Sequence, residues 1–205
     1  MERSMDLDPR YTNRNVELPY DLKADHIEKA VAETYSLFHS LNDYLATRGY
    51  RPFEELILGN SLSGIISEFL VKNVAKSSDC LIANRKVGGH PDLLPAGCYD
   101  SDLVLKGEEG IEIKASIQHG GWQGHNPEES WVMIFRYELP LCLVEIMCAR
   151  LLKSDWSFSG RKGESRRTPT ASITPTGVQK LRNNFVYRIP GVGIGPHKTI
   201  LADNT

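Results

Sequence analysis

The stretch that decides the fold prediction is Tyr99-Asp-Ser-Asp102-Leu-Val-Leu-Lys-Gly-Glu-Glu-Gly110-Ile-Glu112-Ile-Lys114-Ala-Ser116. Two apolar segments flank a connection bounded by glycines, which predicts two adjacent strands. Alternation along a strand puts Glu112 and Lys114 on one face and the isoleucines on the other. Pairing the leucines with the isoleucines brings Asp102 beside Glu112 and Lys114. That register requires a three- or five-residue turn or a bulge at a glycine.

The three polar side chains of this predicted strand pair suit one kind of chemistry. Two neighbouring carboxylates, Asp102 and Glu112, repel each other unless a cation lies between them. Mg²⁺ binds a few carboxylate oxygens and keeps several waters, one of which can attack a phosphodiester. A cation such as Lys114 beside that water favours its deprotonated form and offsets charge on the phosphate. The pattern therefore predicts a Mg²⁺-dependent phosphodiester hydrolysis site, with Mn²⁺ as a substitute.

The segment also resembles a known family. Asp102, an apolar strand, a short loop and Glu112-Ile-Lys114 are similar to the core of the PD-(D/E)xK nuclease superfamily, as found in type II restriction endonucleases. The segment Gly64-Ile-Ile-Ser-Glu68-Phe-Leu resembles the family's first core helix, where a glutamate often lies near the metal. The resemblance implies a restriction-endonuclease-like core, Mg²⁺-dependent cleavage of double-stranded DNA and a homodimer. It assigns metal binding to Asp102 and Glu112, water activation to Lys114 and assistance to Glu68.

One alternative for the metal-binding aspartate stays open. The residue before Asp102 is Ser101, whereas the family name calls for proline, and a literal Pro91-Asp92 lies twenty residues before Glu112. We favour Asp102, because an apolar strand follows it, while Asp92 is followed by Leu-Leu-Pro95 and a glycine, which is typical of a loop. A surface strand with alternating Glu and Lys is the structural alternative to any catalytic role.

Hydrophobic periodicity predicts an α/β (α+β) fold with a single mixed sheet flanked by helices. Helices are expected over 22–46 and from Ser61 or Ser63 to about Ala75, and a short one after Thr174 with Pro175 at its first position. Strands are expected at 81–83, 103–105, 111–116, 131–137, 141–152 and 185–189. The 205 residues are consistent with one nuclease domain, whose parts are a polar arm (1–20), a helical part (22–76), the catalytic sheet (77–152) and a basic part (153–205).

Charge is distributed unevenly along the chain. Residues 1–149 hold 14 Lys/Arg against 23 Asp/Glu, whereas residues 150–198 hold 10 Lys/Arg against two acidic residues. An acidic part joined to a basic part is typical of a chain that gathers carboxylates in one region and contacts phosphates in another. The loop after residue 154 concentrates basic residues and is predicted to contact DNA phosphates through Arg161, Lys162, Arg166 and Arg167.

A second loop rich in glycine and hydrogen-bond donors follows the predicted catalytic strand. Its polar side chains suit contacts with base edges or the DNA backbone, and the residues assigned to DNA binding are Gln118, His119, Gln123, His125 and Asn126. A zinc site from its two histidines is disfavoured, because three of the five residues between them are glycines and no cysteine pair lies near. A loop without such contacts is the alternative.

Several function classes are disfavoured by the sequence. No apolar run reaches about 18 residues, so we expect no membrane span. Four cysteines without a CxxC pair indicate reduced thiols, which favours a cytoplasmic location. The alternatives to a type II restriction enzyme are a repair or junction-resolving nuclease, a non-catalytic DNA-binding module, and a phosphodiesterase acting on RNA or a small molecule.

Overall fold

The helices and strands described below lie in residues 7–124, 126–158 and 170–192, the parts of the chain that the computed structural model describes. The α-helices are α1 (Ala24–Thr47), α2 (Phe53–Leu56), α3 (Gly59–Ser77) and α4 (Pro175–Asn183). The strands are β1 (Leu81–Ala83), β2 (Leu93–Pro95), β3 (Ile111–Ser116), β4 (Gln123–Gly124), β5 (Ser130–Glu138), β6 (Cys142–Leu151), β7 (Trp156–Phe158), β8 (Ala171–Ile173) and β9 (Phe185–Arg188). The predicted α+β class with a mixed sheet flanked by helices is confirmed at this level.

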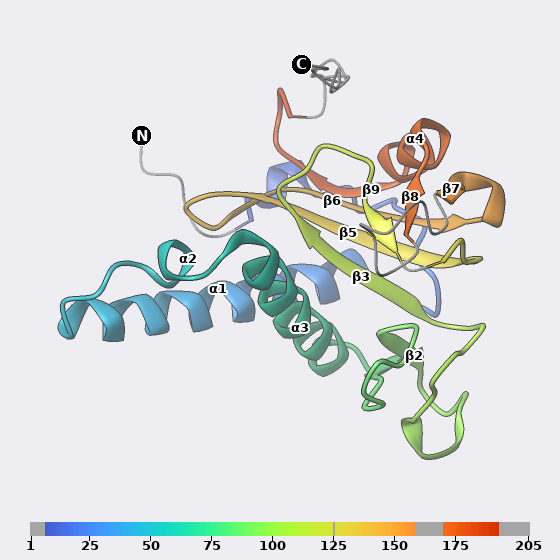
Figure 1. Ribbon diagram of the computed structural model, residues 1–205, viewed down its shortest axis with the longest axis horizontal. Coiled ribbons are helices and arrows are strands. Elements are labelled where there is room, and N and C mark those ends of the chain that lie inside the picture. The colour runs from blue at the N-terminus through green and yellow to red at the C-terminus, as the bar shows by residue number, and fades with distance from the viewer. Residues whose placement is uncertain (1–6, 125, 159–169, 193–205) are drawn as a thin grey trace, which may run out of the picture.

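Two sheets organise the strands. The larger has the order β1-β2-β3-β5-β6-β9, with β3 and β5 parallel and the other neighbours antiparallel. The smaller has the order β4-β8-β7 and is antiparallel. Figure 1 shows α1 and α3 on one side of β3 and β5, with α4 and the smaller sheet on the other side. No helix in the described ranges is long and apolar enough to cross a membrane.

Each face of the larger sheet has its own apolar core. Alternate residues of β3 and β5, such as Ile113 and Met133, pack with α1 and α3. The intervening positions of β5, such as Val132 and Ile134, pack with α4 and the smaller sheet. The period of two that separates these sets is the one expected for strands covered on both faces. A site on the second face is therefore enclosed between the two sheets.

Most of the predicted elements are present. The helix over 22–46 corresponds to α1, and the Thr174 hydroxyl caps α4 by accepting a hydrogen bond from the Gly177 amide at 3.3 Å. The second helix begins earlier than predicted, since Ser61 and Ser63 lie inside α3 and not at its start. The predicted strands outside 103–105 all have counterparts within a few residues.

The strand predicted at 103–105 is wrong. This segment has no strand structure, and Leu103 and Leu105 are 46% and 62% exposed. The neighbours of β3 are instead β2 and β5, and the buried Leu93 of β2 pairs with Ile111. Because β3 has one neighbour on each side, the segment 103–105 has no vacant edge to join.

Candidate active site

Strand β3 presents Glu112 and Lys114 on the face opposite α3, as the alternation predicts. Ile111, Ile113 and Ala115 are buried on the helical side. The two charged side chains lie side by side on the other face, with Lys114 Nζ 2.9 Å from Glu112 Oε1. Their side chains are 18% and 19% exposed, so their interaction is less screened than that of a surface ion pair.

The aspartate that lies next to this pair is Asp92. It precedes β2, and its Oδ2 accepts a hydrogen bond of 2.8 Å from the Ile113 amide, between Glu112 and Lys114 in the chain. Close packing at the start of β3 makes this contact possible. A Cβ at Gly110, whose φ is +138°, would lie 2.2 Å from the Leu93 carbonyl oxygen and 2.3 Å from Pro91, so only glycine fits there.

The pKa values of Asp92 and Glu112 are shifted in opposite directions. Burial, together with the negative charge of Glu112, raises the pKa of Asp92 from its ordinary 3.8 to about 7. Burial would also raise the pKa of Glu112, but the hydrogen bond from His90 and the charge of Lys114 outweigh it and lower that pKa to about 2. Glu112 thus has two cationic neighbours, whereas Asp92 has only the more distant charge of Lys114, and an added divalent cation would relieve the repulsion between the two carboxylates.

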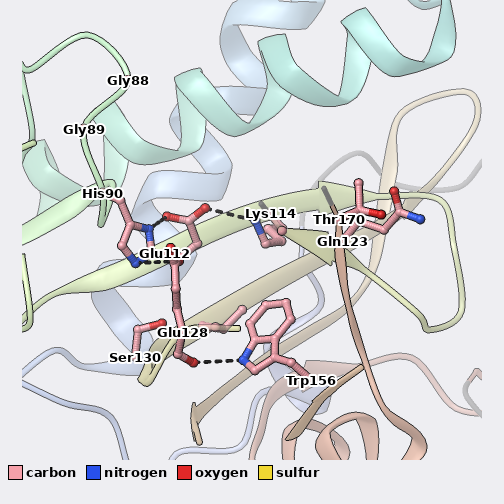
Figure 2. A pocket seen from close by; sticks show the side chains of 12 residues that line it. Gly88, Gly89, His90, Glu112, Lys114, Gln123, Glu128, Ser130, Trp156 and Thr170 are labelled. Carbon is pink, nitrogen blue, oxygen red and sulfur yellow. Dashed lines mark hydrogen bonds and ion pairs between the residues drawn. The ribbon is translucent and has the colours of Figure 1, made fainter. Parts of the chain in front are cut away.

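His90 bridges two glutamates beside this cluster. Its Nδ1 lies 2.8 Å from Glu112 Oε2, and its Nε2 lies 2.9 Å from Glu128 Oε2. Ionised carboxylates only accept hydrogen bonds, so a histidine between two of them favours the imidazolium form, in which both ring nitrogens donate. Although burial opposes the charge, these hydrogen bonds raise the pKa of His90 to about 9. Figure 2 shows the chain of contacts from Glu128 through His90 and Glu112 to Lys114.

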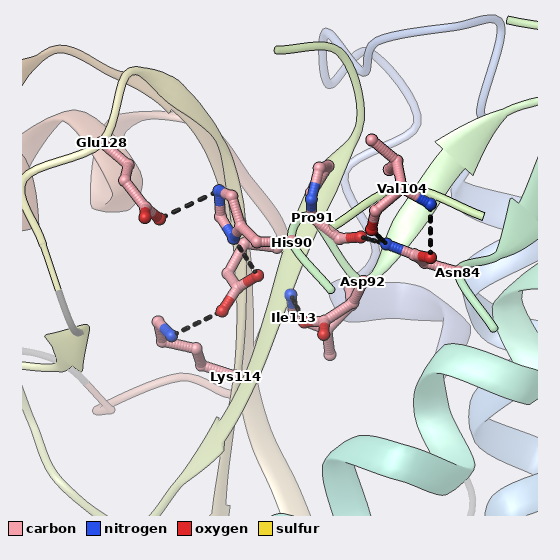
Figure 3. A network of polar contacts seen from close by, with 9 residues as sticks. Asn84, His90, Pro91, Asp92, Val104, Ile113, Lys114 and Glu128 are labelled. Atoms are coloured by element: carbon pink, nitrogen blue, oxygen red, sulfur yellow. Dashed lines mark hydrogen bonds and ion pairs between the residues drawn. The ribbon is translucent and has the colours of Figure 1, made fainter. Parts of the chain in front are cut away.

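Asn84 fixes the turn that carries His90 and Asp92. Its side-chain amide donates hydrogen bonds to the carbonyls of Pro91 (3.0 Å) and Val104 (2.8 Å), and its Oδ1 accepts one from the Val104 amide (3.3 Å). The segment that was expected to be a strand therefore braces the Pro91-Asp92 turn (Figure 3). In this way residues 103–105 contribute to the site without joining the sheet.

A pocket of about 370 Å³ opens beside the cluster on the same face. Figure 2 shows His90, Glu112, Lys114 and Glu128 at its polar end, with Trp156, Gln123 and Thr170 around it. Its lining comes from the turn before β2, from β3 and β5 of the larger sheet, and from β4 and β7 of the smaller one. The described chain thus places the charged cluster in a recess between two sheets.

The other residues predicted to be catalytic lie elsewhere. Asp102 ends a 3-10 turn (Asp100–Asp102) and does not head a strand next to Glu112, since the neighbours of β3 are β2 and β5. Its assignment to metal binding depended on that strand, so the geometry favours the alternative, Asp92. Glu68 is on α3 and exposed, whereas the preceding Ser67 contacts β3 by accepting a 2.8 Å hydrogen bond from the Ala115 amide. The assisting role of Glu68 stays a prediction.

The residues predicted to bind DNA are only partly described. Gln118, His119 and Asn126 are exposed, and Gln123, also exposed, lines the pocket. The His119 carbonyl accepts a 2.9 Å hydrogen bond from Arg182, which holds that loop near α4. The predicted contacts of His125, Arg161, Lys162, Arg166 and Arg167 fall outside the described residues. Their DNA-binding roles remain predictions.

Several basic residues of the C-terminal part serve the fold itself. Lys180 lies 2.6 Å from the buried Asp155, and Arg188 lies 2.7 Å from the buried Glu145. Arg150 forms a looser contact of 3.7 Å with Glu129. The positive charge of these described residues is therefore partly neutralised by acidic neighbours. The uneven charge distribution is a weaker indication of phosphate contacts than the sequence alone suggests.

The donor set fits a magnesium ion held by few protein ligands. Mg²⁺ is commonly bound by one or two carboxylates, with waters and substrate phosphate completing its shell, and Asp92 and Glu112 supply two carboxylates. In the described ranges no group of three or more His, Cys, Asp or Glu side chains is arranged to hold a metal. Residues that sequence reasoning missed are His90 and Glu128, although His90 directly precedes the Pro91-Asp92 pair.

Comparison with known proteins adds no family assignment. No protein-family model matches the sequence, and no curated protein is significantly similar to it.

The pKa shifts predict how the stability of the metal-free protein depends on pH. Asp92 has a folded-state pKa above its ordinary 3.8, so the stability it contributes is full below pH 3.8 and is lost as the pH rises through about 7. His90 contributes stability that is full below pH 6.5 and is lost as the pH rises through about 9. The free energy of unfolding should fall from pH 5 to 9, with a slope of up to about 1.4 kcal/mol per pH unit for each group.

Denaturant unfolding in the presence of a chelator measures this dependence. Asp92→Asn should flatten the curve below pH 7, because asparagine keeps the acceptor for the Ile113 amide but does not ionise. His90→Asn should flatten it above pH 6.5. Equal slopes in the wild type and both variants would contradict these assignments.

Proposed function

We propose that this protein is a Mg²⁺-dependent DNA endonuclease whose centre consists of Asp92, Glu112 and Lys114. The observation that carries the proposal is the ion pair of Glu112 and the half-buried Lys114 in the recess, with the Asp92 carboxyl held against the same strand, beside Glu112, by the Ile113 amide. The resemblance of Glu112-Ile-Lys114 to PD-(D/E)xK nucleases supports it, and Pro91-Asp92 supplies the aspartate in the form that the family name describes. Cleavage of double-stranded DNA at a specific site by a homodimer, as in type II restriction enzymes, belongs to the proposal.

Each residue of the proposed centre has a chemical task. Asp92 and Glu112 would hold the ion, which when bound polarises the phosphate and acidifies a water. Lys114 Nζ, which Glu112 Oε1 holds at 2.9 Å, would donate a hydrogen bond to the attacking water oxygen and stabilise its deprotonated form. The same ammonium group offsets negative charge that develops on the phosphoryl oxygens. The side chains of Lys114 and Glu112 are largely buried, which strengthens these electrostatic interactions.

Incubation of phage DNA with the protein and Mg²⁺, followed by gel electrophoresis, tests the proposed function. Discrete fragments are expected from a site-specific enzyme. A smear would support a nuclease but contradict the restriction-enzyme form. Intact DNA with both Mg²⁺ and Mn²⁺, on linear, supercoiled and branched substrates, would overturn the nuclease proposal in favour of a binding module.

His90 should compete with the metal for Glu112. Both oxygens of Glu112 are occupied, Oε1 by Lys114 and Oε2 by His90, so an ion that takes Oε2 must displace the histidine. His90→Asn is therefore expected to bind Mg²⁺ about tenfold more tightly, which corresponds to the loss of one ion pair of about 1.4 kcal/mol.

Isothermal titration of the DNA-free protein with Mg²⁺ or Mn²⁺ measures this competition. His39→Asn is the matched control, because His39 is exposed on α1 and pairs only with Asp43 within the described structure. Unchanged or weaker metal binding by His90→Asn would contradict the competition.

A further inference from the structure

The pocket extends beyond what the charged cluster alone occupies. It lies between β3 and β5 on one side and the edge strands β4 and β7 of the smaller sheet on the other. Val132 is next to Glu112 on the neighbouring strand and forms part of the pocket wall. The Trp156 ring forms another part, and its indole N–H donates a 2.9 Å hydrogen bond to the Glu128 carbonyl, which holds the ring in place. The cavity thus continues from the charges into an apolar region (Figure 2).

The apolar region carries a few polar groups that lack a structural task. The Ser130 hydroxyl lines the pocket, is on a residue only 6% exposed, and has no hydrogen-bond partner within the described chain. Buried hydroxyls usually have partners, and an unpaired one indicates a group still to be bound. The exposed Gln123 amide lies at the same pocket and can both donate and accept. An apolar body with a few such groups is typical of a small-ligand site.

The dimensions favour one nucleotide. A volume of about 370 Å³ lies at the lower end of the range of about 300–1,000 Å³ typical of small-molecule pockets. An intact duplex, whose major groove alone is about 12 Å wide, does not enter such a space. A nucleotide matches both ends of the pocket, because its phosphate suits Lys114 and its planar base suits Val132 and Trp156. Enzymes that take a base out of the stack bind it between apolar or aromatic side chains and polar readers.

We propose that this pocket binds a single nucleotide of the DNA, lifted out of the helical stack next to the cleaved phosphate. The inference rests on the proposed nuclease function and narrows its substrate class. The base lies against Trp156, with the buried Val132 behind the pocket wall, and Gln123 and Ser130 contact its polar edge. DNA in which one nucleotide is already unpaired should bind more tightly, because the cost of unstacking has been met in advance.

Equilibrium binding to two labelled oligonucleotides tests the proposal. One is a fully paired duplex and the other has the same sequence with a single unpaired thymidine. Ca²⁺ replaces Mg²⁺ to slow hydrolysis. The expected result is at least about tenfold tighter binding of the bulged duplex. Equal affinity for the two DNAs would overturn the proposal. The absence of binding to either DNA would overturn it as well.

Two variants locate the preference in the pocket. Gln123→Trp places a large side chain at the pocket from the exposed strand β4 and should reduce the preference to less than about twofold. Gln179→Trp is the matched control, since Gln179 is exposed on α4 and does not line the pocket. It should retain the preference. If both variants unfold like the wild type, a preference for the bulged duplex that persists in Gln123→Trp would overturn the proposal.

Cleavage of plasmid DNA separates this inference from the proposed function. DNA that is cleaved with Mg²⁺ although both oligonucleotides bind equally refutes only the nucleotide pocket. Plasmid DNA that stays intact with Mg²⁺ and Mn²⁺ refutes the nuclease function, on which the inference depends, whatever the binding data.

Discussion

Lys114→Ala is expected to reduce DNA cleavage by about 10³-fold or more while DNA binding changes little. The ammonium group is the one described cation on the same strand as Glu112, and it lies 2.9 Å from that carboxylate. Its removal deprives the attacking water of a hydrogen-bond donor and the phosphate of a compensating charge, effects that are each worth about 10²-fold to 10³-fold. Single-turnover cleavage and equilibrium DNA binding, measured side by side, separate the two consequences.

Lys106→Ala is the matched control for this variant. Lys106 is exposed, lies in the segment that runs beside His90, and does not line the pocket. The Lys106→Ala protein should cleave DNA at nearly the rate of the wild type. A Lys114→Ala protein that remains fully active would remove the lysine from the mechanism and leave the charged cluster as a structural feature of β3.

Asp92→Asn and Asp102→Asn should have opposite outcomes. Asp92 lies against β3 with its carboxylate beside Glu112, so the amide should lower cleavage by at least about 10²-fold and weaken Mg²⁺ binding. Asparagine retains an acceptor for the Ile113 amide, which keeps the fold. Asp102 ends a 3-10 turn outside the sheet, so its variant should cleave within about twofold of the wild type, as for an ordinary surface substitution.

Rates of plasmid nicking at several Mg²⁺ concentrations measure both effects. If Asp102→Asn is inactive and Asp92→Asn is active, the metal-binding aspartate is Asp102 and the geometry around Ile113 has another purpose. If both variants are fully active, neither aspartate binds the metal.

The sequence predicts the parts of the site that local patterns control. Alternation in Ile111–Ser116 correctly separates Glu112 and Lys114 from the buried isoleucines, because a strand covered by helices on one face must turn its charges to the other. The same logic identifies α1 from its apolar period. The preference for threonine at the N-cap and proline at the first helical position correctly predicts the start of α4 at Thr174-Pro175.

Strand pairing between distant segments is what local patterns fail to predict. Leu103 and Leu105 have the composition of a core strand, yet Leu93 of the three-residue strand β2 pairs with Ile111. A strand this short, which contains Pro95 and lies close to Gly97, has the sequence pattern of a loop. The pairing of β3 with β2, which brings Asp92 to this strand, depends on tertiary packing such as the close approach of Gly110 to Leu93 and Pro91.

The pair His90 and Glu128 illustrates the same difficulty for single side chains. They are 38 residues apart, neither belongs to a periodic pattern, and they meet only because the turn before β2 faces the segment before β5. Charge composition also misleads locally. Lys180 and Arg188, counted as phosphate-binding charge from the sequence, are paired with buried carboxylates.

Nicking of supercoiled plasmid by the wild type and by Glu112→Gln, purified in parallel, tests the central claim most directly. The variant keeps the size of the side chain and removes the charge that binds the ion, and it also reveals any contaminating nuclease. The wild type should convert the plasmid in Mg²⁺ and not in a chelator, while Glu112→Gln leaves it supercoiled in both. Equal conversion by the two proteins, or none by either in Mg²⁺ or Mn²⁺, would contradict a metal-dependent nuclease centred on Asp92, Glu112 and Lys114.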